Sequence, residues 1–129
     1  MATWTSDELR TVGAAEELEL ESLRRDGSRG RPVTIWVVRV GDDLYVRSWK
    51  GHAGAWFRAA QARHEGHVEA GGVRKDVTFV AETDENINDR IDDAYRTKYR
   101  RHGGRYVDPM VAAQARAATI KLVPRAPTA

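Results

Sequence analysis

Apolar and polar residues alternate along this 129-residue chain with a period that changes from segment to segment. Strict alternation over Glu17–Glu21 is typical of a strand with one buried face. Nearly continuous β-branched residues over Pro32–Val40 predict the central strand of a sheet, with the proline at its first position. The same patterns predict four more strands, over Leu44–Ser48, His67–Ala70, Val73–Val80 and Thr119–Val123.

Three segments have helical spacing instead. Thr5 and Glu8 form a capping-box pattern, which predicts a short helix from that point. A second helix is predicted over Gly54–Arg63. The longest begins at Thr83 or Asp84 and is ended by a pair of glycines. Its apolar stripe recurs every four residues, at Ile87, Ile91, Tyr95 and Tyr99.

Short turns separate the predicted strands, with Asp26-Gly27, Gly41–Asp43 and Gly71-Gly72 as the turn residues. Asp108-Pro109 predicts another turn near the end. Six strands joined by such turns favour an antiparallel, closed or partly closed sheet with helices in the gaps. We therefore predict an α+β fold, with one domain over residues 1–125 and a flexible tail over 126–129 that loosens from Pro124 onwards.

The composition of the chain argues against several classes of protein. The chain has no cysteine, which excludes disulfides and thiolate metal sites and makes a reducing cytoplasm the expected compartment. No apolar run is long enough for a membrane span, so no membrane partner is expected. The net charge is only +2, and Trp36, Tyr45 and Phe79 are spaced like core residues. This spacing argues against a nucleic-acid partner.

Two polar clusters suggest chemistry at first sight. His64 and His67 are three residues apart before a predicted strand, whereas a zincin helix needs two histidines four apart, so we predict no metal site. Asp89, Asp92 and Asp93 are predicted to form the solvated face of the long helix rather than a catalytic pair. The chain has no serine nucleophile elbow, Walker loop or dinucleotide fingerprint.

The segment Leu44–Ala60 carries the clearest candidate site. A strand is predicted to end at Arg47 and Ser48, followed by a loop with Lys50 and Gly51 and then the start of a helix. Cations, a hydroxyl and free backbone N–H groups at a helix start suit an anion. Planar apolar surface for a ring is offered by Trp36, Trp49 and Trp56. An ordinary strand-loop-helix with core tryptophans remains the alternative.

Two stretches of the sequence resemble known proteins. Arg31–Ser48 resembles the opening β-meander of split β-barrel proteins, which include pyridoxamine-phosphate-oxidase-like flavoproteins. Trp56–Ala60, followed by Gly66–Ala81, is similar to the deazaflavin-dependent nitroreductases. The chain from about Trp4 to Arg125 is identified as a member of a bacterial family, domain of unknown function 2255. The resemblance implies a six-stranded antiparallel split β-barrel with flanking helices.

The resemblance also implies a homodimer that binds FMN or a deazaflavin coenzyme between its subunits. Cofactor-binding residues implied in this way are Thr34, Trp36, Arg47, Ser48, Lys50, Gly51 and Trp56. The expected function is a flavin- or deazaflavin-dependent oxidoreductase acting on a small organic molecule, with His52 or Tyr95 as proton donor. Many relatives have a lysine near the helix start, where this chain has Gly54 and Ala55. This departure favours the alternative, a cofactor-free enzyme or small-molecule-binding protein using the same pocket.

Overall fold

The computed structural model describes residues 3–24 and 26–125, so the predictions for Arg25 and for the tail over 126–129 lie outside the described residues. The helices are α1 (Ser6–Ala14), α2 (Ala55–Arg63), α3 (Glu85–Lys98), α4 (Gly104–Val111) and α5 (Ala113–Arg116), with 3-10 turns η1 (Gly51–Ala53) and η2 (Arg100–His102). The strands are β1 (Leu18–Ser22), β2 (Val33–Ile35), β3 (Val38–Val40), β4 (Asp43–Arg47), β5 (Glu65–Ala70), β6 (Val73–Ala81) and β7 (Thr119–Pro124).

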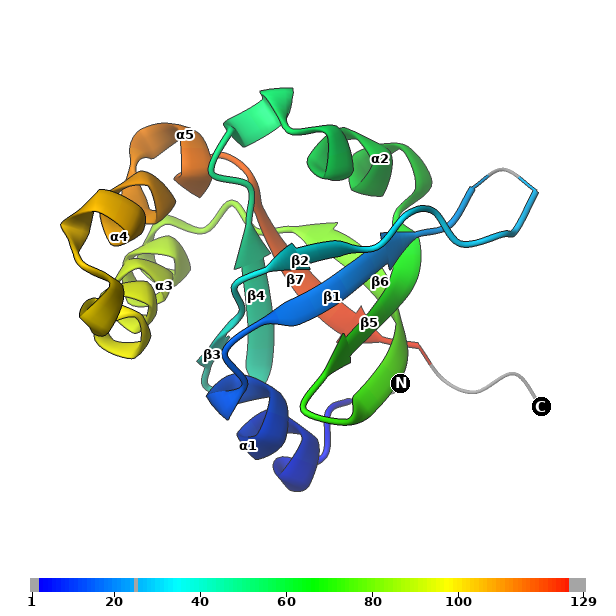
Figure 1. The fold of residues 1–129 in the computed structure, drawn as a ribbon, viewed down its shortest axis with the longest axis horizontal. Helices are drawn as coiled ribbons and strands as arrows, with labels where there is room; N and C mark the ends of the chain where they lie inside the picture. Colours follow the sequence, from blue (N-terminus) through cyan, green and yellow to red (C-terminus); the bar gives the residue numbers. More distant parts are fainter. Residues whose placement is uncertain (1–2, 25, 126–129) are drawn as a thin grey trace.

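The strands form one antiparallel sheet in the order β2-β1-β5-β6-β7-β4-β3. The sheet curls into a partly closed barrel, with α1 and α2 at its two ends and α3, α4 and α5 on one side (Figure 1). The first and last strands of this order are consecutive in the chain. The predicted α+β split-barrel class is therefore confirmed, with seven strands rather than six.

The difference in strand number arises within Pro32–Val40, where the prediction of one central strand is wrong. This segment forms β2 and β3, which lie at the two edges of the sheet. β2 pairs only with β1, and β3 pairs only with β4. Trp36 and Val37 carry the chain from one edge to the other, so the barrel is closed here by the backbone itself instead of by a hydrogen-bonded ladder.

The backbone of Val37, which is fully buried, is hydrogen-bonded to the last residue of α3 and to the residue that follows it, instead of to a strand. Its N–H donates to the Tyr99 hydroxyl at 3.1 Å, and its carbonyl accepts from Lys98 Nζ at 2.6 Å. The Tyr99 hydroxyl also lies 3.0 Å from the Val37 carbonyl and 2.9 Å from the Glu16 carbonyl. Because buried backbone groups must be paired, these side chains make the break between β2 and β3 possible.

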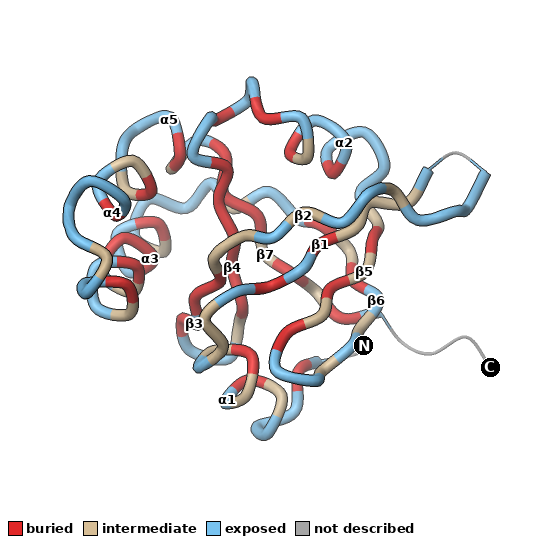
Figure 2. The backbone as a smooth tube through the Cα atoms, viewed as in Figure 1, coloured by how far each residue is buried: buried red, intermediate tan, exposed pale blue. Residues whose placement is uncertain are grey.

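Two apolar clusters hold the elements together. The larger lies inside the barrel and under α1 and α2, where Leu9 and Phe57 are buried. The smaller lies between α3, α4 and the outer face of β3 and β4, with Ile91, Tyr95 and Tyr99 at its centre. Buried residues accordingly run along almost all of β4, which has a cluster on each face, and recur at intervals along α3 (Figure 2). The apolar stripe predicted for the long helix is confirmed.

The helix starts agree with the sequence patterns. Thr5 and Glu8 form both hydrogen bonds of a capping box at α1. Asp84 caps α3 through the N–H of Ile87. The longest helix ends at Lys98, and η2 intervenes before the predicted stop at Gly103, which has a positive φ of 84°.

The predicted turn at Asp108-Pro109 is wrong, because Pro109 lies within α4. Val107 and Met110 of this helix are buried in the smaller cluster, and their burial outweighs the missing proline N–H. Pro124, predicted to begin the loose tail, is instead the last residue of β7 and pairs with Val77.

The Tyr99→Phe variant tests whether the Tyr99 hydroxyl stabilises the closure of the barrel at Val37. Removing the hydroxyl leaves the buried Val37 N–H without a partner, so we expect the free energy of unfolding to fall by roughly 1–3 kcal/mol. Denaturant unfolding measures this change. Tyr106→Phe, at a residue with 58% exposure, is the matched control and is expected to change stability by less than about 0.5 kcal/mol. Equal stabilities for the two variants would contradict the role of Tyr99.

Candidate functional site

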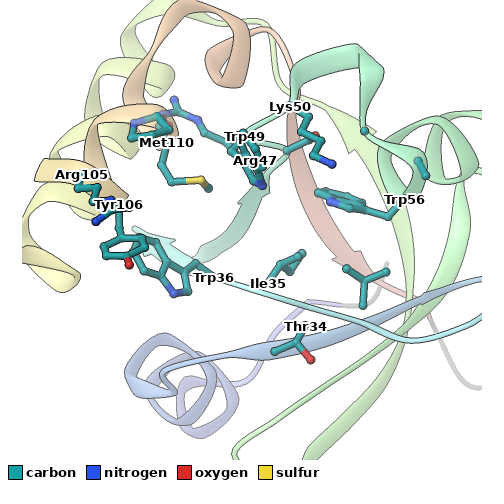
Figure 3. A pocket seen from close by; sticks show the side chains of 15 residues that line it. Thr34, Ile35, Trp36, Arg47, Trp49, Lys50, Trp56, Arg105, Tyr106 and Met110 are labelled. Carbon is teal, nitrogen blue, oxygen red and sulfur yellow. Dashed lines mark hydrogen bonds between the residues drawn. The ribbon is translucent and has the colours of Figure 1, made fainter. Parts of the chain in front are cut away.

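A cavity of about 740 Å³ opens on the side of the barrel between β2, the end of β4 and α4. Its size is typical of small-molecule and cofactor sites. Trp36 and Ile35 form one wall, Trp56 and Lys50 lie across from them, and Met110 points in from the helical side (Figure 3). Four separate segments therefore supply its walls, from β2 through the start of α2 to α4.

The cavity brings together six of the seven predicted cofactor-binding residues. These are Thr34, Trp36, Arg47, Ser48, Lys50 and Trp56. The seventh, Gly51, does not line the cavity. It has a positive φ of 63°, and a Cβ atom there would lie 3.1 Å from the Gln114 carbonyl oxygen, so its role is to let two loops approach closely.

Neither predicted proton donor lines the cavity. His52 lies in η1 on the surface, where its Nε2 is 3.1 Å from the Ala117 carbonyl and its ring meets the edge of Phe57. Tyr95 is fully buried on α3, its hydroxyl has no hydrogen-bond partner among the described residues, and burial raises its pKa well above the ordinary value. The sequence patterns place these two residues near the site, and the fold separates them from it.

Arg47 lines the cavity, but every N–H group of its guanidinium is hydrogen-bonded within the protein. The residue is 1% exposed. Its five hydrogen bonds run from Nε to Thr119 Oγ1 (2.9 Å), from Nη1 to Asp92 Oδ1 (2.5 Å) and the Met110 carbonyl (2.9 Å), and from Nη2 to the carbonyl (3.1 Å) and side-chain oxygen (2.9 Å) of Asn88. A guanidinium has five N–H donors, so none is left for a ligand.

Asp92 is the charged partner of Arg47, and the prediction that it lies on a solvated face is wrong. It is 7% exposed, and its second oxygen accepts from Arg116 Nη1 at 2.5 Å. Asp89 and Asp93 are exposed as predicted. Burying a guanidinium is costly without a paired anion, so Asp92 holds the site together instead of acting in the cavity.

The start of α2 forms the most polar part of the cavity. Gly54 caps this helix without a side-chain hydrogen bond, which leaves the first N–H groups of α2 without an intrahelical acceptor. Ser48 is 2% exposed. A Cβ atom on Gly54 would lie 2.4 Å from the Ser48 Oγ, so the glycine lets hydroxyl and helix start converge. Lys50 lies beside them.

Sequence reasoning missed the lining residues of α4, because Pro109 directed the interpretation towards a turn. Arg105, Tyr106, Pro109 and Met110 all line the cavity. The three-residue spacing of the buried pair Val107 and Met110 is the signal that could have revealed a helix. Tyr106 is largely exposed, as is Trp49 on the other side.

No group of three or more metal-ligating side chains occurs among residues 3–24 and 26–125, and His67 instead contacts Asp76 at 3.0 Å. None of the helices in the described part of the chain is long and apolar enough to cross a membrane.

The family of uncharacterized proteins conserved in bacteria known as DUF2255 matches residues 8–122. The protein belongs to this family. The match includes every segment that lines the cavity, from β2 to α4. A search of curated protein sequences gives no match.

Solved structures share the fold of this DUF2255 protein at low sequence identity. A candidate pyridoxamine 5′-phosphate oxidase from Listeria innocua has a TM-score of 0.63 and 16% identity, covering 92% of this chain and 90% of the other. The FAD- and haem-binding protein of Mycobacterium smegmatis gives 0.53 and 18%, covering 94% and 65%. An F420 reductase gives 0.50 and 14%, covering 91% and 92%. These likenesses establish the split-barrel fold.

Asp92→Ala tests the structural role of Arg47 in the DUF2255 protein. The substitution leaves a buried guanidinium without its paired anion, so the free energy of unfolding should fall by about 3–5 kcal/mol. Asp93→Ala is the matched control, one residue along the same helix, with an 80% exposed side chain that should contribute less than about 0.5 kcal/mol. Denaturant unfolding of both variants provides the comparison. A loss for Asp92→Ala no larger than for Asp93→Ala would show that the pair does not hold the site together.

Proposed function

We propose that the protein binds a flavin or deazaflavin coenzyme in this cavity and acts as an oxidoreductase on a small organic molecule. One observation carries the proposal. A single cavity joins planar aromatic walls to the uncapped start of α2, beside a buried Ser48 hydroxyl and the Lys50 ammonium. A planar ring that carries a phosphate group needs this combination of surfaces. Solved structures with the same fold include FAD-binding and F420-reductase proteins, which supports the choice.

The polar end fits the phosphate of such a coenzyme. Backbone N–H groups at the start of α2 would donate to phosphate oxygens, where the helix dipole also favours negative charge. Ser48 would donate one further hydrogen bond, and Lys50 would supply the charge. Arg47 is the last residue of β4 and directly precedes Ser48, so its hydrogen bonds to Asp92 and to the Met110 carbonyl position this end without contacting the ligand.

The apolar walls fit the ring. Trp36 is half-buried and stacks on Tyr99 with ring centroids 3.9 Å apart, so one of its faces is already fixed by the protein. Trp56 meets the edge of Phe57, and Ile35 and Met110 complete the apolar surface. When bound, a flavin or deazaflavin supplies the hydride chemistry. The side chains of this chain orient the ring and exclude water from one side of it.

We also propose that the protein is a homodimer. Trp49 and Tyr106 are 55% and 58% exposed, and both lie at the cavity mouth. Large exposed aromatic side chains at the opening of a cavity are typical of an interaction surface. A second copy would cover them and narrow the opening, and the mass of the protein in solution reports on this directly.

A cofactor-free pocket is the second candidate function, and a specific observation favours it. Among the described residues, Lys50 is the one cation left at the phosphate end, because Arg47 is fully paired and Gly54 and Ala55 carry no charge. A phosphate end with one cation suits a smaller anionic or neutral ligand as well as a nucleotide-like one.

Titration of the purified protein with FMN and, separately, with coenzyme F420 decides between these candidates. Binding is followed by quenching of tryptophan fluorescence, because Trp36, Trp49 and Trp56 line the cavity. We expect saturable quenching by one coenzyme in the micromolar range. Lys50→Gln should weaken that binding by about tenfold, since charged hydrogen bonds contribute roughly 1.5–3 kcal/mol.

Arg58→Gln is the matched control for Lys50→Gln. Arg58 is exposed on α2 and does not line the cavity, so its substitution should leave the affinity unchanged. If neither coenzyme quenches the wild-type fluorescence, the oxidoreductase proposal is wrong and the cofactor-free pocket replaces it. If both variants bind as wild type does, the phosphate is held elsewhere.

A further inference from the structure

The cavity has a cation, Arg105, that lies away from the proposed phosphate end. None of the fifteen lining residues is acidic. Of the three lining cations, Arg47 is neutralised by Asp92. Lys50 and Arg105 form no ion pair within the described part of the chain. Each instead lies over the ring of its aromatic neighbour, 5.4 Å from the Trp49 centroid for Lys50 Nζ and 5.9 Å from the Tyr106 centroid for Arg105 Cζ.

These two cations lie on opposite sides of the cavity (Figure 3). Lys50 is on the side of Ser48 and α2, whereas Arg105 comes from α4. Met110 and Trp49 lie between them in this view, and Trp36 and Ile35 form the wall below. Because apolar side chains separate the cations, a compact anionic group that contacts one of them does not reach the other.

We propose that Arg105 and Tyr106 form a second anion-binding subsite, which receives the carboxylate of the substrate. The apolar body of that substrate would lie against Met110 and Trp36. This inference rests on the proposed function, in which the coenzyme phosphate occupies the side of Lys50. It assigns the substrate class as small carboxylates with an aromatic or aliphatic body.

The local structure suits Arg105 to this role. A guanidinium binds a carboxylate through two parallel hydrogen bonds, and stacking on the Tyr106 ring limits its freedom before a ligand arrives. α4 is itself held in place, because the Met110 carbonyl accepts from Arg47. The subsite therefore stands on a helix that is anchored to the core. The absence of acidic side chains from the lining makes the local potential attractive to anions.

A pair of probes with the same ring system tests the subsite. 2-Naphthoate carries a carboxylate, and 2-naphthalenemethanol replaces it with a neutral alcohol. Calorimetric titration of both into the wild-type protein, saturated with whichever coenzyme it binds, should show tighter binding of 2-naphthoate. Arg105→Gln should weaken 2-naphthoate by about tenfold or more and change 2-naphthalenemethanol by less than about twofold. Arg105→Lys keeps the charge and should retain part of the preference.

Arg100→Gln is the matched control, because Arg100 is exposed on η2 and lies outside this cavity. Equal binding of the two probes to wild type, or equal 2-naphthoate affinity in wild type and Arg105→Gln, overturns the inference. So does a loss of coenzyme affinity in Arg105→Gln, since Arg105 would then hold the coenzyme. If no coenzyme binds, the proposed function fails, and the same titrations on the protein alone still decide whether Arg105 selects carboxylates.

Discussion

The buried pair of Arg47 and Asp92 determines where the walls of the cavity stand. Arg47 ends β4, Asp92 lies on α3, and the Met110 carbonyl that shares the guanidinium lies on α4. A guanidinium removed from water is tolerable only when its charge and its donors are all matched, so the sheet and two helices are fixed relative to one another. Because all of its donors are used in these hydrogen bonds, Arg47 has none left for a ligand. The cations that remain for ligands are Lys50 and Arg105, on opposite sides of the cavity.

A second constraint acts at the point where the barrel closes. Trp36 and Val37 join the edge strands β2 and β3, and the backbone of Val37 is paired by the side chains of Lys98 and Tyr99 at the end of α3. Because of this break, Trp36 lies outside any strand, and its ring stacks on that of Tyr99 with an interplanar angle of 2°. Closure of the barrel thus also forms a wall of the cavity. Fold and site therefore depend on the same segment, because Asp92 lies on α3 and Tyr99 directly follows its last residue.

The periodicity of the sequence correctly predicted elements that have a regular apolar pattern or that are formed by contacts between residues close in sequence. β1, the capping box at Thr5 and the stripe from Ile87 to Tyr99 are examples. The prediction of one strand over Pro32–Val40 was wrong. The β-branched composition of this segment indicates an extended backbone, but it does not show that the chain passes from one edge of the sheet to the other. The position of Arg47 near the site was predicted, but its role was not, because the sequence does not show which residues accept hydrogen bonds from its five N–H groups. α4 was hidden by Pro109, and with it Arg105.

The most direct test of the different roles of Arg47 and Lys50 is a crystal structure of the protein grown with FMN and another grown with coenzyme F420. The expected result is a coenzyme phosphate bound by Ser48, Lys50 and the first turn of α2, its ring against Trp36, and Arg47 still bonded to Asp92. A phosphate held by Arg47 with the Asp92 pair broken, or a ring bound outside the cavity, would contradict it.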